Sequence, residues 1–322
     1  MKKVISLVLA IVMIISTCVT FSACTDDAKN KKITVGICQL VQHESLDQAT
    51  QGFIDALVAE LGEENVEFDV QNASGDTNVC NTIMTSFVSK GVDLILANAT
   101  PALQAAYNAT SEIPILGTSI TEYGVALGIE NFSGVVGENV SGTSDLAPLD
   151  KQAEMILELC PEVKVVGITY CSAEANSLYQ VQKVTEYLQG RGVTVKAYPF
   201  ADSNDISAVV TAACSQCDAL YIPTDNTAAS CAEIIGNIVR EAKIPVFAGE
   251  ENTTRVCGVA SLTISYYDLG VQTGKMAAKI LKGEADISTM AIEYAPATKK
   301  YNKDMAEFLG IDIPEGYIEI EK

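Results

Sequence analysis

The sequence contains no tryptophan and only one histidine, His43. The lack of tryptophan argues against a sugar site built on indole stacking. Cys214 and Cys217 have CxxC spacing, but neither a second CxxC pair nor a pair of histidines completes a zinc site. A Ser-His-Asp site would have to use His43, and nothing near it in the sequence marks a nucleophile. We therefore expect no metal site and no catalytic residue.

Sequence motifs of enzyme chemistry and of nucleic-acid binding are also missing. There is no Gly-x-Ser-x-Gly elbow, no Walker A loop and no Gly-x-Gly-x-x-Gly fingerprint. Basic residues are few, with 21 Lys and Arg against 41 Asp and Glu, so the net charge is −20. Such a surface is a poor partner for nucleic acid or anionic lipid. The sequence predicts a protein that is not an enzyme, needs no cofactor and binds no nucleic acid.

Only one long apolar stretch is present, and it lies at the N-terminus. Lys2 and Lys3 precede the apolar segment 4–15, which is too short to cross a bilayer and is typical of a signal peptide. We assign the signal peptide to 1–23. The sequence Phe21-Ser22-Ala23-Cys24 resembles a bacterial lipobox, which implies a lipid on Cys24 and a tether over 24–32. The expected location is the outer face of the cell membrane; an ordinary signal peptide with a chance cysteine is the alternative.

Eight cysteines remain after Cys18 and Cys24 are set aside. In an exported protein they raise the question of a disulfide framework. A chain of this length buries an ample core without covalent links, and several of these cysteines lie in apolar runs, where cysteine packs as a small hydrophobe. We expect free thiols, with a Cys214–Cys217 disulfide as the alternative.

Four segments of the first half recur in the same order in the second half. ITVGICQ is similar to VVGITYC, VEFDVQNASGDTN to VTVKAYPFADSND, DLILANATPA to DALYIPTDNT, and IPILGTS to IPVFAGE. The period is roughly 130 residues, which is too long for a solenoid repeat. The sequence therefore predicts two similar lobes.

Strands alternate with helical patterns in both halves, which indicates an α/β fold with parallel sheets covered on both faces. Ligands of such folds bind beyond the carboxyl ends of the strands. The polar segments that follow the strands are 98–100, 118–120, 171–177, 224–226 and 249–251. We expect them to line a cleft between two Rossmann-like lobes.

The predicted lobes are discontinuous in sequence. We assign 33–140 and 256–288 to lobe 1, and 141–255 and 289–322 to lobe 2. Residues 135–139 are expected to form the last strand before the first crossover, and 258–264 to return to lobe 1. Three crossovers make a hinge, as in proteins that close around a ligand.

Several longer motifs carry a resemblance to a known family. They are GICQLVQHESLDQATQGF (36–53), NATPALQAA (98–106), LGTSITEY (116–123), VGENVSGTSDLAPLDKQAEMI (136–156), YCSAEANS (170–177), FADSND (200–205), YIPTDNTAAS (221–230) and SYYDLG (265–270). The chain resembles type I substrate-binding proteins of ABC importers, in the subfamily associated with tryptophan, tyrosine and phenylalanine uptake. It departs from that pattern at Cys38 and at Glu44-Ser45. The resemblance implies the type I periplasmic binding protein fold, an amino acid ligand, and a permease with its ATPase as partners; we expect a monomer.

The expected cleft suits a zwitterion. A ligand carboxylate would meet hydroxyls and helix N-termini on lobe 1, and Asp225 would accept the ammonium group, with Asp145 and Glu174 as further candidates. Asp225 could instead be a helix N-cap, and Gln39, His43 and Tyr266 could line the pocket or simply pack. The predicted ligand-binding residues are Gln39, His43, Asn98, Ala99, Thr100, Thr118, Ser119, Asp145, Glu174, Asn176, Ser177, Thr224, Asp225, Asn226, Glu250 and Tyr266.

Two other functions remain open on the sequence alone. A ligand sensor of the same fold could feed a membrane receptor, because fold does not fix function. An importer protein could also bind a nucleoside or another small polar ligand. The identity of the aromatic side chain rests on the resemblance only.

Overall fold

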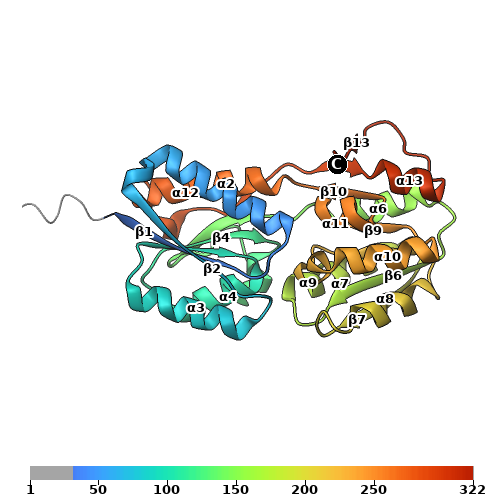
Figure 1. The fold of residues 1–322 in the computed structure, drawn as a ribbon, viewed down its shortest axis with the longest axis horizontal. Coiled ribbons are helices and arrows are strands. Elements are labelled where there is room, and N and C mark those ends of the chain that lie inside the picture. Colours follow the sequence, from blue (N-terminus) through green and yellow to red (C-terminus); the bar gives the residue numbers. More distant parts are fainter. Residues whose placement is uncertain (1–31, 322) are drawn as a thin grey trace, which may run out of the picture.

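The computed structural model describes residues 32–321, and the predicted signal peptide, Cys24 and all of the tether except Lys32 lie outside this part. The described chain forms two lobes side by side, each with a central sheet and helices on both faces (Figure 1). No helix within residues 32–321 combines the length and the apolar character that a membrane span requires.

Lobe 1 contains a six-stranded parallel sheet in the order β11-β5-β4-β3-β1-β2. Helices α2 and α12 cover one face, and α3, α4 and α5 lie on the other. The elements of this lobe are β1 (Ile33–Gln39), α2 (Glu44–Leu61), β2 (Val66–Asn72), α3 (Thr77–Lys90), β3 (Leu94–Asn98), α4 (Thr100–Ala109), β4 (Ile115–Ile120), α5 (Tyr123–Leu127), β5 (Val140–Ser144), α12 (Tyr266–Leu281) and β11 (Glu293–Tyr294).

Lobe 2 contains a seven-stranded sheet in the order β13-β12-β10-β9-β8-β6-β7, in which only the β10–β12 pair is antiparallel within the described chain. Its elements are α6 (Leu149–Leu159), β6 (Val165–Cys171), α7 (Ala175–Gly190), β7 (Thr194–Phe200), α8 (Ile206–Cys214), β8 (Ala219–Ile222), α9 (Asn226–Ser230), α10 (Ala232–Ala242), β9 (Val246–Ala248), α11 (Glu251–Cys257), β10 (Ala260–Thr263), β12 (Thr298–Tyr301), α13 (Lys303–Leu309) and β13 (Ile318–Glu319).

The predicted duplication is confirmed by the strand orders. β1, β2, β3 and β4 occupy the same places in lobe 1 as β6, β7, β8 and β9 in lobe 2. Each lobe has an apolar core on each face of its sheet. Phe53 and Phe87 are fully buried on opposite faces in lobe 1, and Met155 and Ile235 in lobe 2. Because the strands are parallel, their carboxyl ends gather at one edge of each sheet.

All three crossovers lie later in the sequence than predicted. β5 continues to Ser144 in the lobe 1 sheet, whereas 135–139 makes only isolated bridges, so lobe 1 does not end at 140. β10 pairs with β9 and β12, so 258–264 belongs to lobe 2 and the prediction of its return to lobe 1 is wrong. β11 pairs with β5, which keeps 289–294 in lobe 1. The hinge therefore consists of the segments that follow β5, β10 and β11.

Helices α2 and α12 pack with their backbones unusually close. A Cβ atom on Gly270 would lie 2.0 Å from the carbonyl oxygen of Ala49, and one on Gly52 would lie 2.1 Å from that of Tyr267. Gly274 faces the backbone of Phe53 in the same way, with a Cβ distance of 2.6 Å. The three glycines thus allow α12, which arrives from far along the chain, to complete lobe 1.

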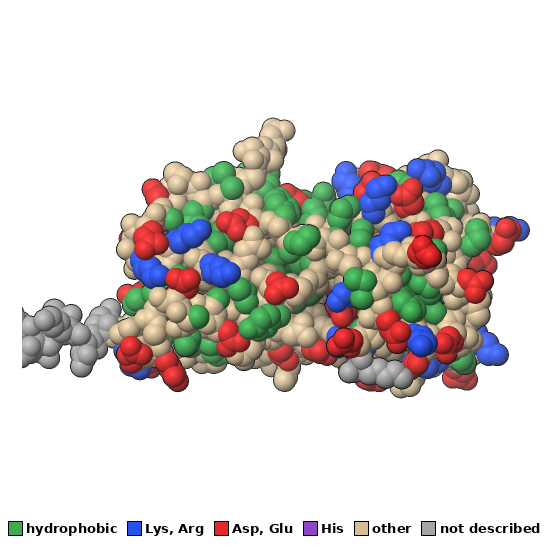
Figure 2. Space-filling model, turned by 90° about the horizontal axis from the view of Figure 1, so that it is seen from above, with side chains coloured by type: hydrophobic (Ala, Val, Ile, Leu, Met, Phe, Trp, Pro, Cys, Tyr) green, Lys and Arg blue, Asp and Glu red, His purple; other side chains and the backbone are tan. Residues whose placement is uncertain are grey.

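The eight cysteines within residues 32–321 are all free thiols, and six of them are buried. The Cys214–Cys217 disulfide left open by the sequence is therefore not formed in the structure. Acidic and basic side chains are interspersed over both lobes on the face shown in Figure 2, rather than gathered in one patch. On this face the charged side chains of both signs are therefore distributed over both lobes.

Candidate ligand-binding site

A small polar pocket lies between the lobes at the carboxyl ends of the strands. Residues of lobe 1, lobe 2 and the hinge meet in this narrow pocket. The residues that line it are His43, Leu46, Ser119, Thr121, Asp145, Asn176, Thr224, Asp225, Asn226, Ala229, Glu250 and Tyr266. All of these except Leu46, Thr121 and Ala229 were among the predicted residues. Leu46 and Ala229 are apolar helix residues that the sequence pattern does not separate from core residues.

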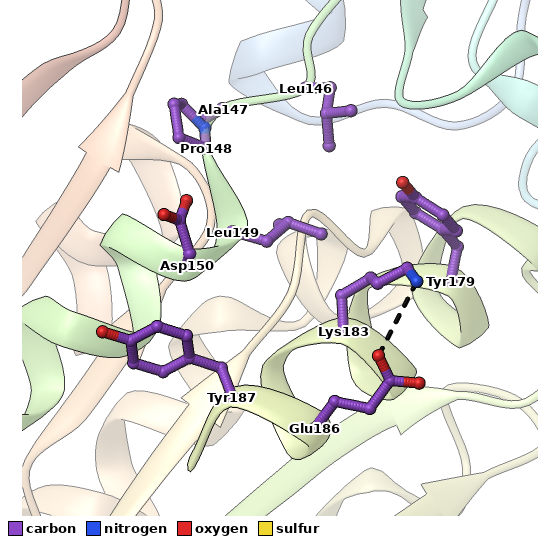
Figure 3. A pocket seen from close by; sticks show the side chains of 9 residues that line it. All are labelled: Leu146, Ala147, Pro148, Leu149, Asp150, Tyr179, Lys183, Glu186 and Tyr187. Carbon is purple, nitrogen blue, oxygen red and sulfur yellow. Dashed lines mark ion pairs between the residues drawn. The ribbon is translucent and has the colours of Figure 1, made fainter. Parts of the chain in front are cut away.

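A larger cavity of about 980 Å³ lies elsewhere, against α7 and the segment 146–150 (Figure 3). Tyr179 and Tyr187 flank it, and Lys183 pairs with Glu186 at 3.7 Å on its rim. Both charged side chains are largely exposed, and none of the predicted site residues reaches this cavity. We therefore place the site in the smaller interlobe pocket, where buried polar groups of both lobes meet.

Asp145 is the most distinctive residue of the interlobe pocket. It follows β5 at the first crossover and accepts a hydrogen bond on Oδ2 from the hydroxyl of Tyr266, which follows the second crossover, at 2.9 Å. Its other oxygen, Oδ1, is buried and has no hydrogen-bond partner among the described residues. Burial raises the pKa of Asp145 to about 6; the hydroxyls of Tyr266 and Thr121 oppose this shift, and the charge of Glu250 adds to it. A buried carboxylate oxygen without a donor is costly unless a ligand supplies one.

Asp225 has a different role. Its Oδ1 accepts from the backbone N–H of Ala228 at 2.8 Å, which makes it the N-cap of α9. Its Oδ2 accepts from the N–H of Cys171 at 2.6 Å and from the hydroxyl of Ser177 at 2.7 Å. Burial, with the nearby charge of Glu174, raises the pKa of Asp225 to about 7. The capping interpretation is confirmed, and both oxygens are already engaged by donors of lobe 2.

Glu174 and Asn176 organise the same wall of the pocket. Glu174 accepts from the N–H and hydroxyl of Thr227, at 2.9 and 2.8 Å, and from the side-chain amide of Asn226 at 2.7 Å. Asn176 donates to the carbonyl of Thr224 at 2.9 Å, and its buried Oδ1 has no hydrogen-bond partner in the described part of the chain. Glu174 and Ser177 thus hold α9 in place, while Asn176 keeps a free acceptor in the pocket lining.

Several predicted residues of lobe 1 lie behind the pocket rather than in its lining. Asn98 donates to the carbonyl of Leu46 at 2.8 Å and to Thr50 at 2.9 Å, and Thr50 donates to Gln39 at 2.8 Å. Gln39 and Asn98 therefore position the N-terminal part of α2. Thr118 belongs to a buried hydroxyl cluster with Thr143 and Thr273, 3.4 and 3.3 Å away.

The tips of β3 and β4 have unusual backbone conformations. Ala99, which precedes α4, has φ = 94°, and Ser119 has φ = 57°. Non-glycine residues rarely adopt positive φ, and such residues cluster at functional sites. The hydroxyls of Ser119 and Thr100 are buried without a partner in the described chain, but only Ser119 reaches the pocket.

The pocket as a whole favours a cationic group. Three of its lining residues are buried carboxylic acids, Asp145, Asp225 and Glu250, and none of the described residues that line it is Lys or Arg. Among the described residues that line the pocket, His43 is the only basic one. Its Nε2 lies 3.4 Å from Oδ1 of Asn226 across the lobes, and its Nδ1 has no hydrogen-bond partner within residues 32–321. A ligand ammonium group would therefore be attracted, and a ligand carboxylate would have to be met by neutral donors.

The family model of the ABC transporter substrate-binding proteins matches residues 34–319. The chain belongs to this family. Because members of this family bind solutes, the prediction that the chain is not an enzyme is confirmed. This chain is 36% identical over 295 residues to the tyrosine-binding protein of Clostridioides difficile (strain R20291). The match covers 88% of this chain and 85% of that protein.

Two solved structures extend the comparison. An ABC domain in complex with L-Trp from Streptococcus pneumonia is 34% identical, with a TM-score of 0.85 over 90% of this chain and 100% of that chain. The ligand-free, open structure of a substrate-binding protein with adhesive properties from Clostridium difficile is 36% identical, with a TM-score of 0.67 over 89% and 99%. These matches confirm the type I fold and the resemblance to the aromatic amino acid subfamily.

Proposed function

We propose that this substrate-binding protein captures an aromatic amino acid, tryptophan, tyrosine or phenylalanine, in the interlobe pocket and delivers it to an ABC importer. The observation that carries the proposal is the buried Oδ1 of Asp145, which has no hydrogen-bond partner within residues 32–321 and lies in a pocket built by both lobes. Oδ1 would accept a hydrogen bond from the ligand's α-ammonium group, which is a charge-assisted interaction. The relatives whose names refer to tyrosine and L-Trp support the amino acid class.

The opposite end of the ligand would meet the neutral donors of lobe 1. Ser119 offers a buried hydroxyl that has no hydrogen-bond partner within residues 32–321. The apolar lining residues Leu46 and Ala229 would contact the ligand's side chain. This assignment replaces Asp225, our first candidate from the sequence, with Asp145, because Asp225 already caps α9.

A thermal-shift screen of the twenty amino acids tests the ligand class. At a concentration of 100 times its dissociation constant, a bound amino acid should add about 2.7 kcal/mol to the free energy of unfolding. We expect shifts with L-tryptophan, L-tyrosine or L-phenylalanine and none with D-ribose or myo-inositol. A shift with a nucleoside or a sugar but with no amino acid would refute the proposed ligand and leave the fold assignment intact.

We also propose that the protein is exported, anchored through a lipid on Cys24, and acts as a monomer beside a permease and its ATPase. The basis is the lipobox-like sequence 21–24. A lipid with two or more acyl chains holds a protein firmly at a membrane, whereas a single chain binds weakly. Cys24→Ser should move the protein from the membrane fraction to the soluble fraction without changing ligand affinity. A processed variant that stays with the membranes would contradict the lipid anchor.

A further inference from the structure

The N-terminal turn of α2 in lobe 1 touches the N-terminal turn of α11 in lobe 2. The hydroxyl of Ser45 donates to Oε2 of Glu250, and the side-chain amide of Asn252 donates to Ser45 Oγ at 2.8 Å. Ser45 is fully buried, and Glu250 is 2% exposed. Beside them, Arg255 pairs with Glu44 at 2.7 Å, with side chains 28% and 53% exposed.

Glu250 is held in place by contacts within lobe 2, independently of the position of lobe 1. It is the N-cap of α11, accepting from the backbone N–H groups of Thr253 and, at 2.9 Å, Asn252. Ser45 is held on lobe 1 by the hydrogen-bonded N-terminal part of α2. The bonds of Ser45 to Glu250 and Asn252 therefore depend on the relative position of the lobes.

The lobes are arranged here as in a ligand-bound relative. At nearly equal identity and coverage, the TM-score is 0.85 to the L-Trp complex and 0.67 to the open, ligand-free structure. When the lobes separate, water can replace Ser45 at Glu250. When they close, the carboxylate is buried and needs the hydroxyl. The loss of this donor thus penalises only the closed arrangement.

We propose that Ser45, Glu250 and Asn252 form an interlobe latch that stabilises the closed arrangement and slows ligand release. Ser45 and Asn252 act as positioning residues, because they do not line the pocket. The exposed Arg255–Glu44 pair contributes less, since solvent screens it. The effect on ligand release rests on the proposed function, whereas the effect on closure does not.

Ser45→Ala tests the latch. With L-tryptophan, L-tyrosine or L-phenylalanine as the probe, stopped-flow measurements should show dissociation about tenfold faster, equivalent to about 1.4 kcal/mol, with little change in the association rate. The melting temperature without ligand should fall only slightly, because the ligand-free variant can open and let water hydrogen-bond to Glu250. Ser89→Ala is the matched control, because Ser89 lies on the exposed face of α3 and bonds only within its own helix at 2.8 Å.

Asn252→Ala should act through the same hydroxyl, so its effect and that of Ser45→Ala should not add in the double variant. Unchanged dissociation, or a fall in ligand-free stability that accounts for the loss of affinity, would overturn the latch. If the wild-type protein binds none of the three amino acids, the proposed function fails by itself. Small-angle scattering then decides on the latch: it predicts a larger radius of gyration for ligand-free Ser45→Ala than for wild type, and equal radii overturn it.

Discussion

Asp145→Asn is expected to weaken the binding of the aromatic amino acid by about tenfold to a hundredfold. A hydrogen bond between charged partners contributes roughly 1.5–3 kcal/mol, and each 1.4 kcal/mol is about tenfold in affinity. Asparagine keeps the size of the side chain and can still accept the hydrogen bond from Tyr266. The variant therefore removes the charge and little else. Isothermal titration calorimetry measures the effect.

The pH dependence of binding gives the same substitution a second readout. Burial raises the pKa of Asp145 to about 6, and an ammonium ligand prefers the ionised carboxylate. Wild-type affinity should rise with pH up to about pH 6 and then level off. The affinity of Asp145→Asn should lack the part of this pH dependence that comes from ionisation of the Asp145 carboxyl group. In the ligand-free protein the sign is opposite: the folded state holds the proton more tightly than the unfolded state, so stability falls as the pH rises from about 4 to about 6.

Asp225→Asn is the comparison that can refute the assignment. Both oxygens of Asp225 accept hydrogen bonds, one from Ala228 and the other from Cys171 and Ser177. The NH2 group of an asparagine cannot accept, so Asp225→Asn should lower the melting temperature of the ligand-free protein. If Asp225→Asn instead weakens binding more than Asp145→Asn and leaves that melting temperature unchanged, then Asp225 is the ammonium acceptor and Asp145 is not.

Gly270→Ala is expected to destabilise lobe 1 by about 3 kcal/mol or more, although it adds a single methyl group. The new Cβ would lie 2.0 Å from the carbonyl oxygen of Ala49, so α2 and α12 would have to move apart along their whole contact. Overpacking of this kind typically costs about 1–3 kcal/mol, and here the obstacle is backbone rather than a flexible side chain. Thermal unfolding followed by circular dichroism should show a fall of roughly 6–12 °C.

Gly190→Ala is the matched control for this substitution. Gly190 is the last residue of α7, and an added Cβ there meets nothing within 4 Å. Alanine favours the helix by roughly 0.5–1 kcal/mol over glycine, so the control should be neutral or slightly stabilising. Equal melting temperatures for the two variants would show that α2 and α12 separate at little cost.

The sequence predicted the repeated strands correctly because each is a short apolar run between turn residues, and both copies obey the same pattern. The crossovers were predicted less well because β5 is not apolar. Its buried residues Ser141, Thr143 and Ser144 bond to Met290, Thr273 and Thr121, which lie elsewhere in lobe 1. These hydroxyls find their hydrogen-bond partners only in the folded structure, so the sequence pattern of the segment does not predict a core strand. For the same reason its counterpart β10 was not predicted as a strand of lobe 2.

The candidate site was predicted at the level of the cleft but not of individual roles. Polar residues after each strand identified the pocket, since strand ends of a parallel sheet converge. Sequence could not tell which carboxylate is already engaged. The carboxylates of Asp225 and Glu174 accept hydrogen bonds from backbone N–H groups of lobe 2, whereas Oδ1 of Asp145 accepts none within residues 32–321. This difference depends on how β6, α9 and the hinge pack in the folded protein.

The discontinuous lobes also determine the order in which the chain can fold during synthesis. β5 pairs with β11, and α2 packs on α12, but β11 and α12 are synthesised much later than their partners. Lobe 1 therefore lacks one strand and one covering helix until the ribosome has passed Tyr294. Contacts between segments so distant in sequence form slowly, because a long loop must close before they are gained. The N-terminal half therefore emerges as an incomplete domain. This delay leaves time for the proposed export before lobe 1 acquires its final core.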